Sequence, residues 1–194
     1  MLMSFYHAIK WSIEAAWIAF CAYWFIMAFD VKRAVKRQSL SSRGLHIAVG
    51  VVAYLLLFTD RFSWGPLAWR FLPESRAWAA AGAAVTWAGV ALAIWARAIL
   101  GRNWSATVTV KQDHTLVRSG PYSAVRHPIY SGVLLAGLGT AIAAGEVHCL
   151  LAVAIGLVGF RVKSKLEEQF MIEQFGREYE EYRQHSWALV PFVL

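Results

Sequence analysis

Apolar residues are concentrated in five stretches of the chain that contain no aspartate, glutamate, lysine or arginine. These stretches are residues 15–29, 44–59, 77–96, 127–145 and 147–160. A helix needs roughly 20 apolar residues to cross a hydrocarbon core about 30 Å thick. The first three stretches reach or approach that length when flanking residues are added, and the last two are shorter. The pattern therefore predicts an all-α integral membrane protein with about five transmembrane helices.

The last two apolar stretches are separated only by Gly145 and Glu146. A connection of two residues is typical of a tight hairpin of two helices. We expect these helices, over 129–144 and 147–160, to be sheltered by the others or to cross a locally thinned bilayer. The alternative is a single bent or re-entrant element. Small residues that permit close helix approach in lipid run along the third and fourth stretches, at Ala79, Ala80, Ala81, Gly82, Gly132, Ala136, Gly137 and Gly139.

The composition agrees with a membrane protein. Of the 194 residues, 58% are apolar and 16% are charged, and the mean hydropathy is +0.45. These values exclude a disordered chain and leave too much apolar surface for a soluble domain of this size. Cys21 and Cys149 both lie in apolar stretches, so they predict neither a disulfide framework nor a cysteine metal site. We expect a single domain over residues 1–194, with three spans in residues 1–100.

The distribution of positive charge predicts the orientation. The net charge is +7, and fourteen of the 19 lysine and arginine residues lie in the first connection, the third connection and the tail after residue 160. Basic connections favour the cytoplasmic side, so the N-terminus is predicted outside and the C-terminus in the cytoplasm. The first hydrophobic run is too long for a cleavable signal peptide and lacks an obvious cleavage site. We expect a bacterial plasma membrane, with lipid headgroups rather than nucleic acid as partners of the positive charge.

An odd number of spans places the third connection (101–128) and the tail (161–194) on the same side of the membrane. Within the connection, Thr107–Val110 alternates with β-branched residues, which predicts a partly extended loop. Pro128 disfavours a helical His127 and suits the first turn of a helix, so we expect the fourth helix to begin at Pro128. The N-terminal end of that helix would face the cytoplasmic loop, where it can hold a carboxylate or another anion.

The tail has the periodicity of an amphipathic helix, with apolar side chains at Val162, Leu166, Phe170 and Phe175. We expect this helix to lie at the membrane surface with a solvated charged face. Glu167 and Glu168 follow the last apolar stretch by about two turns, and carboxylates so close to a membrane indicate a functional role. His114 and His127 lie on the facing connection. Without an H-E-x-x-H motif or a cysteine pair, these histidines predict no metal site.

Segment 114–132, HTLVRSGPYSAVRHPIYSG, resembles the signature of the isoprenylcysteine carboxyl methyltransferase family. The Glu167–Glu168 pair, the run FGREYEEY (175–182), the segment GRNWS (101–105) and the Pro191–Phe192 ending resemble the same family. The most specific part is R-H-P-x-Y-x-G, followed about 35 residues later by E-E. The resemblance covers roughly residues 100–194, and it implies that residues 101–194 form the catalytic core of a membrane methyltransferase.

Family membership implies S-adenosylmethionine as the methyl donor, held between the third connection and the tail. The cofactor-binding residues that the resemblance implies are His114, Thr115, Leu116, Val117, Tyr122, His127, Pro128, Ile129, Tyr130 and Glu167. The first four would contact the adenosyl part, largely through the backbone. Glu167 would bind the ammonium group or the ribose hydroxyls of the cofactor. The resemblance further implies catalytic roles for Arg126, Lys163 and Glu168.

Lys163 lies where the family commonly has an arginine that faces the substrate. Lysine keeps the charge but lacks the planar fork that grips a carboxylate with two bonds, which leaves the acceptor open. A sulfonium donor and a carboxylate acceptor need neither a metal nor a general base. Lys163 or Arg126 would then steer the carboxylate, while the protein supplies proximity and a dry site. We therefore predict a carboxyl O-methyltransferase for a lipophilic, isoprenylcysteine-like or otherwise prenylated acceptor, with Lys163 binding the substrate.

Three other functions are compatible with the sequence. A phospholipid N-methyltransferase would need a base, for which Glu168 is available, although the cationic Lys163 disfavours an ammonium acceptor. Membrane sterol reductases resemble the C-terminal half, but they have additional spans and use a nicotinamide cofactor. The third alternative is a non-catalytic membrane scaffold.

Overall fold

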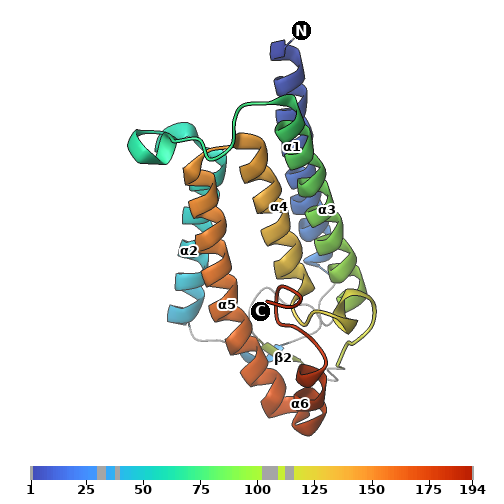
Figure 1. Cartoon of the computed structure of the whole chain (residues 1–194). Helices are drawn as coiled ribbons and strands as arrows, with labels where there is room; N and C mark the ends of the chain where they lie inside the picture. Colours follow the sequence, from blue (N-terminus) through green and yellow to red (C-terminus); the bar gives the residue numbers. More distant parts are fainter. Residues whose placement is uncertain (1, 30–33, 38–39, 102–108, 112–115, 194) are drawn as a thin grey trace.

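The computed structural model is an elongated helical bundle with short polar elements at one end (Figure 1). It describes residues 2–29, 34–37, 40–101, 109–111 and 116–193. The helices are α1 (Leu2–Met27), α2 (Leu40–Phe58), α3 (Arg76–Leu100), α4 (Pro128–Ala144), α5 (Val147–Phe175) and α6 (Arg177–Gln184). The strands are β1 (Ala34–Arg37) and β2 (Thr109–Lys111), and short 3₁₀ turns lie at Asp60–Phe62, Gly65–Ala68 and Gly120–Ser123.

Helices α3 and α4 pack closely because glycines lie at their interface. A Cβ atom on Gly89 would lie 2.3 Å from the backbone nitrogen of Ala136, and one on Gly139 would lie 2.3 Å from the backbone nitrogen of Thr86. No side chain fits in such a space, so glycine is required for this approach of the two backbones. Gly82, Gly132 and Gly139 of the predicted small-residue faces are thereby confirmed at this interface, whereas Ala80 and Ala81 are exposed. The packing is typical of helices in lipid.

Helices α4 and α5 form the predicted hairpin and are not one bent element. Gly145 ends α4 with a φ of 74°, a left-handed conformation that glycine adopts without strain. Glu146 is extended, and α5 begins at Val147. Pro128 lies in the first turn of α4, and His127 before it has a φ of −122° and a ψ of 57°. The predicted start of this helix is therefore confirmed.

The amphipathic tail does not begin as a separate helix. The charged tail continues the fifth apolar stretch without a break, so α5 has 29 residues. The helix first stops at Gly176, which has a φ of 53°. Neither a proline nor a left-handed residue interrupts Val147–Phe175, and helix formation is cooperative once it is nucleated. The apolar half of α5 therefore continues without a break into the polar half that bears Lys163, Glu167 and Glu168.

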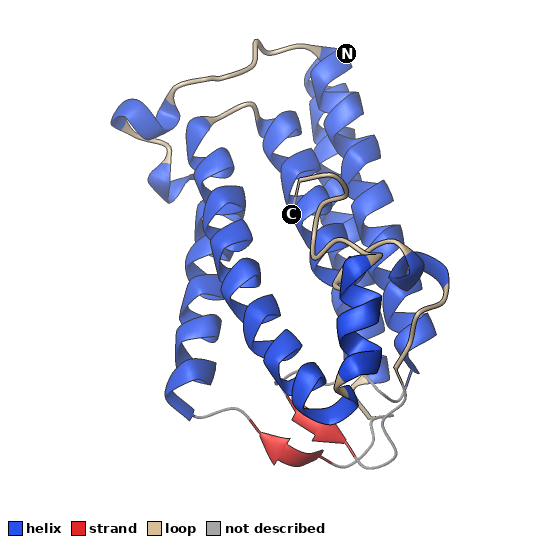
Figure 2. Cartoon of the chain, turned by 60° about the horizontal axis from the view of Figure 1, so that its bottom comes forward, coloured by secondary structure: helices blue, strands red, loops and turns tan. Residues whose placement is uncertain are grey.

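A short antiparallel sheet departs from the all-α prediction. In the register of β1 and β2, Ala34 faces Lys111 and Arg37 faces Thr109. The β-branched residues of the third connection favour an extended backbone, as expected, but their pairing with the first connection was not predicted. Figure 2 shows the sheet at the end of the bundle that also holds α6. Strand β2 contacts α5, so the two basic connections meet the tail at one end of the molecule.

Two helices of the described part of the chain, α3 and α5, are long and apolar enough to cross a membrane. Gly44–Phe58 and Pro128–Ala144 are shorter apolar helices. Large apolar side chains cover the outside of the bundle: Trp11, Ile47 and Val158 are 63–70% exposed. Soluble proteins avoid such continuous apolar surface, whereas lipid solvates it. The chain is thus an integral membrane protein, and the number of five spans stays a prediction.

Candidate functional site

The residues predicted for the site gather where α4 begins and the polar half of α5 passes beside it. His127 precedes α4, and Glu167 and Glu168 face it from α5. The two carboxylates share this histidine, because His127 Nδ1 is 3.3 Å from Glu167 Oε2 and Nε2 is 3.3 Å from Glu168 Oε1. The third connection and the tail therefore meet, as expected, because the α4–α5 hairpin returns the chain to the end from which α4 starts.

Glu168 is held by cations from two other segments. Arg126 Nε donates a hydrogen bond of 2.8 Å to Glu168 Oε1, and Arg183 Nε of α6 lies 3.4 Å from Oε2. The side chains of Arg126 and Glu168 are each only 9% exposed. A shielded pair with several hydrogen bonds fixes the geometry of the groups around it. This arrangement favours a positioning role for both residues.

Glu167 faces a stack of aromatic rings. The Tyr130 hydroxyl donates a hydrogen bond of 2.5 Å to Glu167 Oε1. The Tyr130 ring is stacked with Phe160, at 4.6 Å between ring centroids, and with His127, at 5.6 Å. Lys163 Nζ lies 5.2 Å from the centroid of the Tyr130 ring, a distance at which an aromatic face attracts a cation. A carboxylate and a cation-binding ring thus lie side by side.

The His127 imidazole is buried between the two carboxylates. Burial lowers its pKa because the charged ring loses water. The hydrogen bonds and charges of Glu167 and Glu168 outweigh burial, and the net effect raises the pKa of His127 above its ordinary value of 6.5. Folding therefore stabilises the imidazolium form, in which both ring nitrogens donate, relative to the unfolded chain.

We expect His127 to make the thermal stability fall as the pH rises above 6.5. Because folding raises the pKa of His127, its stabilisation is complete below the unfolded pKa and is lost as the pH rises through the folded pKa. The measurement is thermal unfolding in detergent between about pH 6 and about pH 9, for the wild type and for His127→Gln. The variant should show a flatter profile, and parallel profiles would exclude His127 as the titrating group.

The segment after α6 closes the site from a third side. Trp187 forms a parallel bridge with Val125. The backbone N–H groups of Arg126 and His127 donate to the carbonyls of Trp187, at 2.8 Å, and Ala188, at 3.0 Å. The two residues that face Glu168 are therefore held at their backbone by the C-terminal segment.

Sequence analysis missed two partners of the site. The Ser186 carbonyl accepts a hydrogen bond from the Arg126 guanidinium, and Arg183 is the second cation on Glu168. A carbonyl acceptor has no signature in the sequence. Arg183 directly follows the run FGREYEEY (175–182), and this position was the only sign in the sequence that it belongs to the site.

Of the other residues predicted to bind the cofactor, some are described only by their burial and two lie outside the described part of the chain. Tyr122 is buried, and its carbonyl accepts a hydrogen bond from the Tyr182 hydroxyl. Pro128 is buried, Leu116, Val117 and Ile129 are half-buried, and His114 and Thr115 fall outside the described residues.

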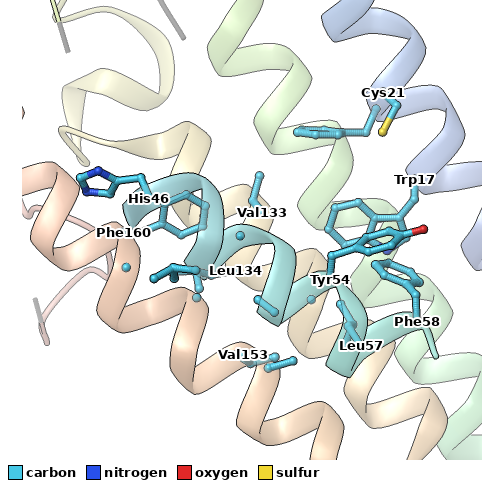
Figure 3. A pocket seen from close by; sticks show the side chains of 18 of the residues that line it. Trp17, Cys21, His46, Tyr54, Leu57, Phe58, Val133, Leu134, Val153 and Phe160 are labelled. Carbon is cyan, nitrogen blue, oxygen red and sulfur yellow. The ribbon is translucent and has the colours of Figure 1, made fainter. Parts of the chain in front are cut away.

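A large apolar cavity reaches the site from within the bundle. It has a volume of about 1020 Å³ and is lined by α1, α2, α4 and α5, which is at the upper end of the range for small-molecule sites. Figure 3 shows Trp17 and Phe58 at one end and Phe160 at the other. Lys163, one turn beyond Phe160, also lines the cavity, so this cation belongs both to the cavity and to the Tyr130 stack.

Residues 77–178, more than half of the chain, match the phospholipid methyltransferase family. Over 98 residues, the chain is 38% identical to the "Probable protein-S-isoprenylcysteine O-methyltransferase" of Oryza sativa subsp. indica, covering 48% of this chain and 50% of that protein. It is 36% identical over 97 residues to the cobalt-zinc-cadmium resistance protein CzcN of Cupriavidus metallidurans, covering 48% and 44%. The chain thus spans about half the length of the curated relatives that it matches.

The fold resembles a solved structure, that of the eukaryotic intramembrane Ras methyltransferase ICMT (isoprenylcysteine carboxyl methyltransferase). The TM-score is 0.57 at 23% sequence identity, and the match covers 82% of this chain and 55% of the other. The sequence resemblance to isoprenylcysteine carboxyl methyltransferases is confirmed by the curated relatives, and the structural match extends to the fold of the N-terminal helices. By the match over residues 77–178, this chain belongs to the phospholipid methyltransferase family.

Proposed function

We propose that this protein transfers a methyl group from S-adenosylmethionine to the carboxylate of a lipophilic, isoprenylcysteine-like acceptor. The observation that carries the proposal is the place of Lys163, where the apolar cavity meets the Glu167 site. A lipophilic acid would fit such a junction, with its hydrocarbon chain in the cavity and its carboxylate beside Lys163. The names of the isoprenylcysteine O-methyltransferase relatives support the same acceptor class.

The residues of the site fit S-adenosylmethionine chemically. The Tyr130 ring already carries the Lys163 ammonium at 5.2 Å, and an aromatic face that attracts one cation also attracts a sulfonium. Glu167 beside it offers a carboxylate to an ammonium group or to ribose hydroxyls. We propose that Glu167, Tyr130 and His127 form the centre of the cofactor site. Around them would lie the other predicted residues, His114, Thr115, Leu116, Val117, Tyr122, Pro128 and Ile129.

The bound cofactor supplies a methyl group on a positively charged sulfur, and transfer to a carboxylate neutralises both charges without moving a proton. The protein then has to bind, orient and dehydrate the two reactants. Lys163 would hold the acceptor carboxylate near the Tyr130 ring. Arg126 and Glu168 would act as positioning residues, because their charges already satisfy one another. Phe160 and the apolar cavity would exclude water from the acceptor side.

The proposed site faces the cytoplasm, which supplies the soluble cofactor. The first connection, the third connection and the tail are basic, and strands β1 and β2 and the end of α5 bring them to this end of the bundle. Lys and Arg favour the cytoplasmic side. The N-terminus lies at the opposite end of the molecule (Figure 1). We propose a plasma-membrane location in a bacterium, with the acceptor entering from the lipid.

Phospholipid N-methylation is the second candidate function, because the matching family is described by that activity. An ammonium acceptor has to lose a proton before it can attack, so it needs a free base. Glu168 is engaged by Arg126, His127 and Arg183, and the cavity presents the cationic Lys163 at the site. Both features favour an acidic acceptor over an amine.

We expect Lys163→Ala to lower kcat/KM for N-acetyl-S-farnesyl-cysteine by about tenfold or more, because a hydrogen bond to a charged group contributes about 1.5–3 kcal/mol. The affinity for S-adenosylmethionine should stay within about twofold of the wild type, since the proposal gives Lys163 to the acceptor. The measurements are methyl-transfer kinetics and equilibrium dialysis of the labelled cofactor.

Lys163→Arg is the matched variant, because it keeps the charge that steers the carboxylate. It should retain most of the activity that Lys163→Ala loses. If the alanine variant loses cofactor affinity and turnover in parallel, Lys163 belongs to the cofactor site or to folding, and its proposed role is wrong.

A further inference from the structure

The far end of the cavity is built by helices outside the family match. Its walls from α1 and α2 include Trp17, Gly50 and Phe58, whereas the matching segment is 77–178. Side chains at this end lie far from the reacting atoms. They can therefore determine which acceptors fit without contacting the methyl donor. The cavity therefore has a site end, at Lys163, and a distal end whose α1 and α2 walls lie outside the matching segment.

The charges that line the cavity give it a direction. Lys163 lies at the site end, and Glu14 lies on α1 almost one turn beyond Trp17, at the distal end. A carboxylate is attracted to the first and repelled by the second. An acidic lipid is thus oriented with its head at Lys163 and the tip of its hydrocarbon chain toward Trp17.

The length of the cavity can be read along α5. Ala152 and Lys163 both line it and are eleven residues apart on this helix, which is roughly 16 Å at the rise of 1.5 Å per residue. An extended chain advances about 1.3 Å for each bond of about 1.5 Å, so roughly twelve bonds span this distance. The carboxyl carbon, Cα, Cβ and sulfur of the cysteine take about four of these bonds. A farnesyl chain therefore already fills the cavity to its distal end, and a geranylgeranyl chain, which is one isoprene unit longer, exceeds it.

A fixed aromatic wall lies at the distal end. The Trp17 ring meets the Phe58 ring edge to face, at 5.5 Å between centroids, which joins α1 to α2. Tyr54 lies 5.0 Å from the Phe58 ring on the same helix. Trp17 Nε1 donates a hydrogen bond of 3.1 Å to Thr140 Oγ1 of α4, which holds the indole in place. Such a wall resists displacement by the tip of a longer chain.

We infer that the Trp17–Phe58 wall limits the length of the acceptor's hydrocarbon chain, so that this enzyme prefers a farnesyl-length acid to a geranylgeranyl one. The inference rests on the proposed function for the identity of the head group. It adds two specificity-determining residues, both remote from the methyl donor, and a defined class of substrate.

Gly50→Leu tests the inference by shortening the cavity. Gly50 lines it midway along α2, and a Cβ atom there meets nothing within 4 Å, so the leucine enters the cavity without a clash. The probes are the N-acetyl-cysteine thioethers of geranyl, farnesyl and geranylgeranyl chains. For Gly50→Leu, kcat/KM with the farnesyl probe should fall about tenfold or more, while the geranyl value changes less than about threefold.

Phe58→Ala tests the opposite change, because it opens the distal end. The geranylgeranyl probe should gain on the farnesyl probe by about tenfold in the ratio of their kcat/KM values. Gly44→Leu is the matched control, since Gly44 also has nothing within 4 Å of a Cβ atom but does not line the cavity. This control should leave the chain-length preference unchanged.

Thermal stabilisation by each probe is measured in parallel, because it reports binding without methyl transfer. One outcome is that the probes stabilise the protein to a degree that depends on chain length and that changes in Gly50→Leu, while no methyl group is transferred. That result would support the wall and refute the proposed function. Methyl transfer with equal preference for all chains in every variant would support the function and overturn the wall. Neither binding nor transfer would overturn both.

Discussion

Glu167→Gln is expected to weaken S-adenosylmethionine binding by at least about tenfold, because a charge-assisted hydrogen bond contributes about 1.5–3 kcal/mol and tenfold corresponds to about 1.4 kcal/mol. The substitution keeps the shape of the side chain and an oxygen that can accept from the Tyr130 hydroxyl, which now lies 2.5 Å from Glu167 Oε1. It removes the negative charge that the proposed site offers to the cofactor. The measurement is equilibrium dialysis of the labelled cofactor against detergent-purified protein.

The matched control is Glu180→Gln, because Glu180 lies exposed on α6 and outside the site. Both variants should elute as folded, monodisperse protein, and only Glu167→Gln should lose affinity. If a stable Glu167→Gln protein binds the cofactor as tightly as the wild type, Glu167 is not part of the cofactor site.

Gly89→Ala is expected to destabilise the protein by about 3 kcal/mol or more, since overpacking of a tight interface costs about 1–3 kcal/mol and more where the backbone has to move. The added methyl carbon would lie 2.3 Å from the backbone nitrogen of Ala136 and 2.6 Å from the Gly132 carbonyl oxygen. Because both obstacles are backbone atoms, no rotamer change relieves the clash, and α3 has to separate from α4. The measurement is the thermal unfolding temperature in detergent.

Gly44→Ala is the comparison for this prediction, because its new methyl group meets nothing within 4 Å. Alanine is also the better helix former, so Gly44→Ala should be neutral or slightly stabilising. An unchanged unfolding temperature for Gly89→Ala would mean that α3 and α4 do not approach as closely as described.

The local features of this fold could be predicted because local chemistry determines them. Pro128 restricts the residue before it and begins α4, and Gly145 supplies the left-handed residue that ends this helix. The glycine and alanine faces of α3 and α4 were also visible as runs of small residues. Each of these signals depends on a few neighbouring positions in the chain.

The features that were missed depend on contacts between distant segments. The continuity of α5 to Phe175 is an exception, because the absence of proline between Val147 and Phe175 is a local signal that the sequence contains. The pairing of β1 with β2 uses backbone groups that every sequence has. The cavity exists only because α1 and α2 line one side of α4 and α5, and no periodicity within one helix contains that information.

The residues that gather at the start of α4 were predictable from the sequence, but their contacts were not. Arg126, His127, Glu167 and Glu168 could be named from the resemblance, and the structure brings them together. Glu168 was expected to be catalytic. Its ion pairs with Arg126 and with Arg183, which the sequence did not single out, favour a positioning role instead.

The most direct test of the central claim is the alkali lability of the methylated product. Purified protein is incubated with S-adenosylmethionine labelled in its methyl group, together with N-acetyl-S-farnesyl-cysteine and phosphatidylethanolamine in one mixed micelle. A carboxyl methyl ester releases its label as methanol when base is added, whereas an N-methyl group on a lipid does not. We expect the label to be released by base and to depend on the prenylated acid. Label that stays non-volatile on the headgroup amine after base treatment, or no transfer to either acceptor, would contradict the proposal.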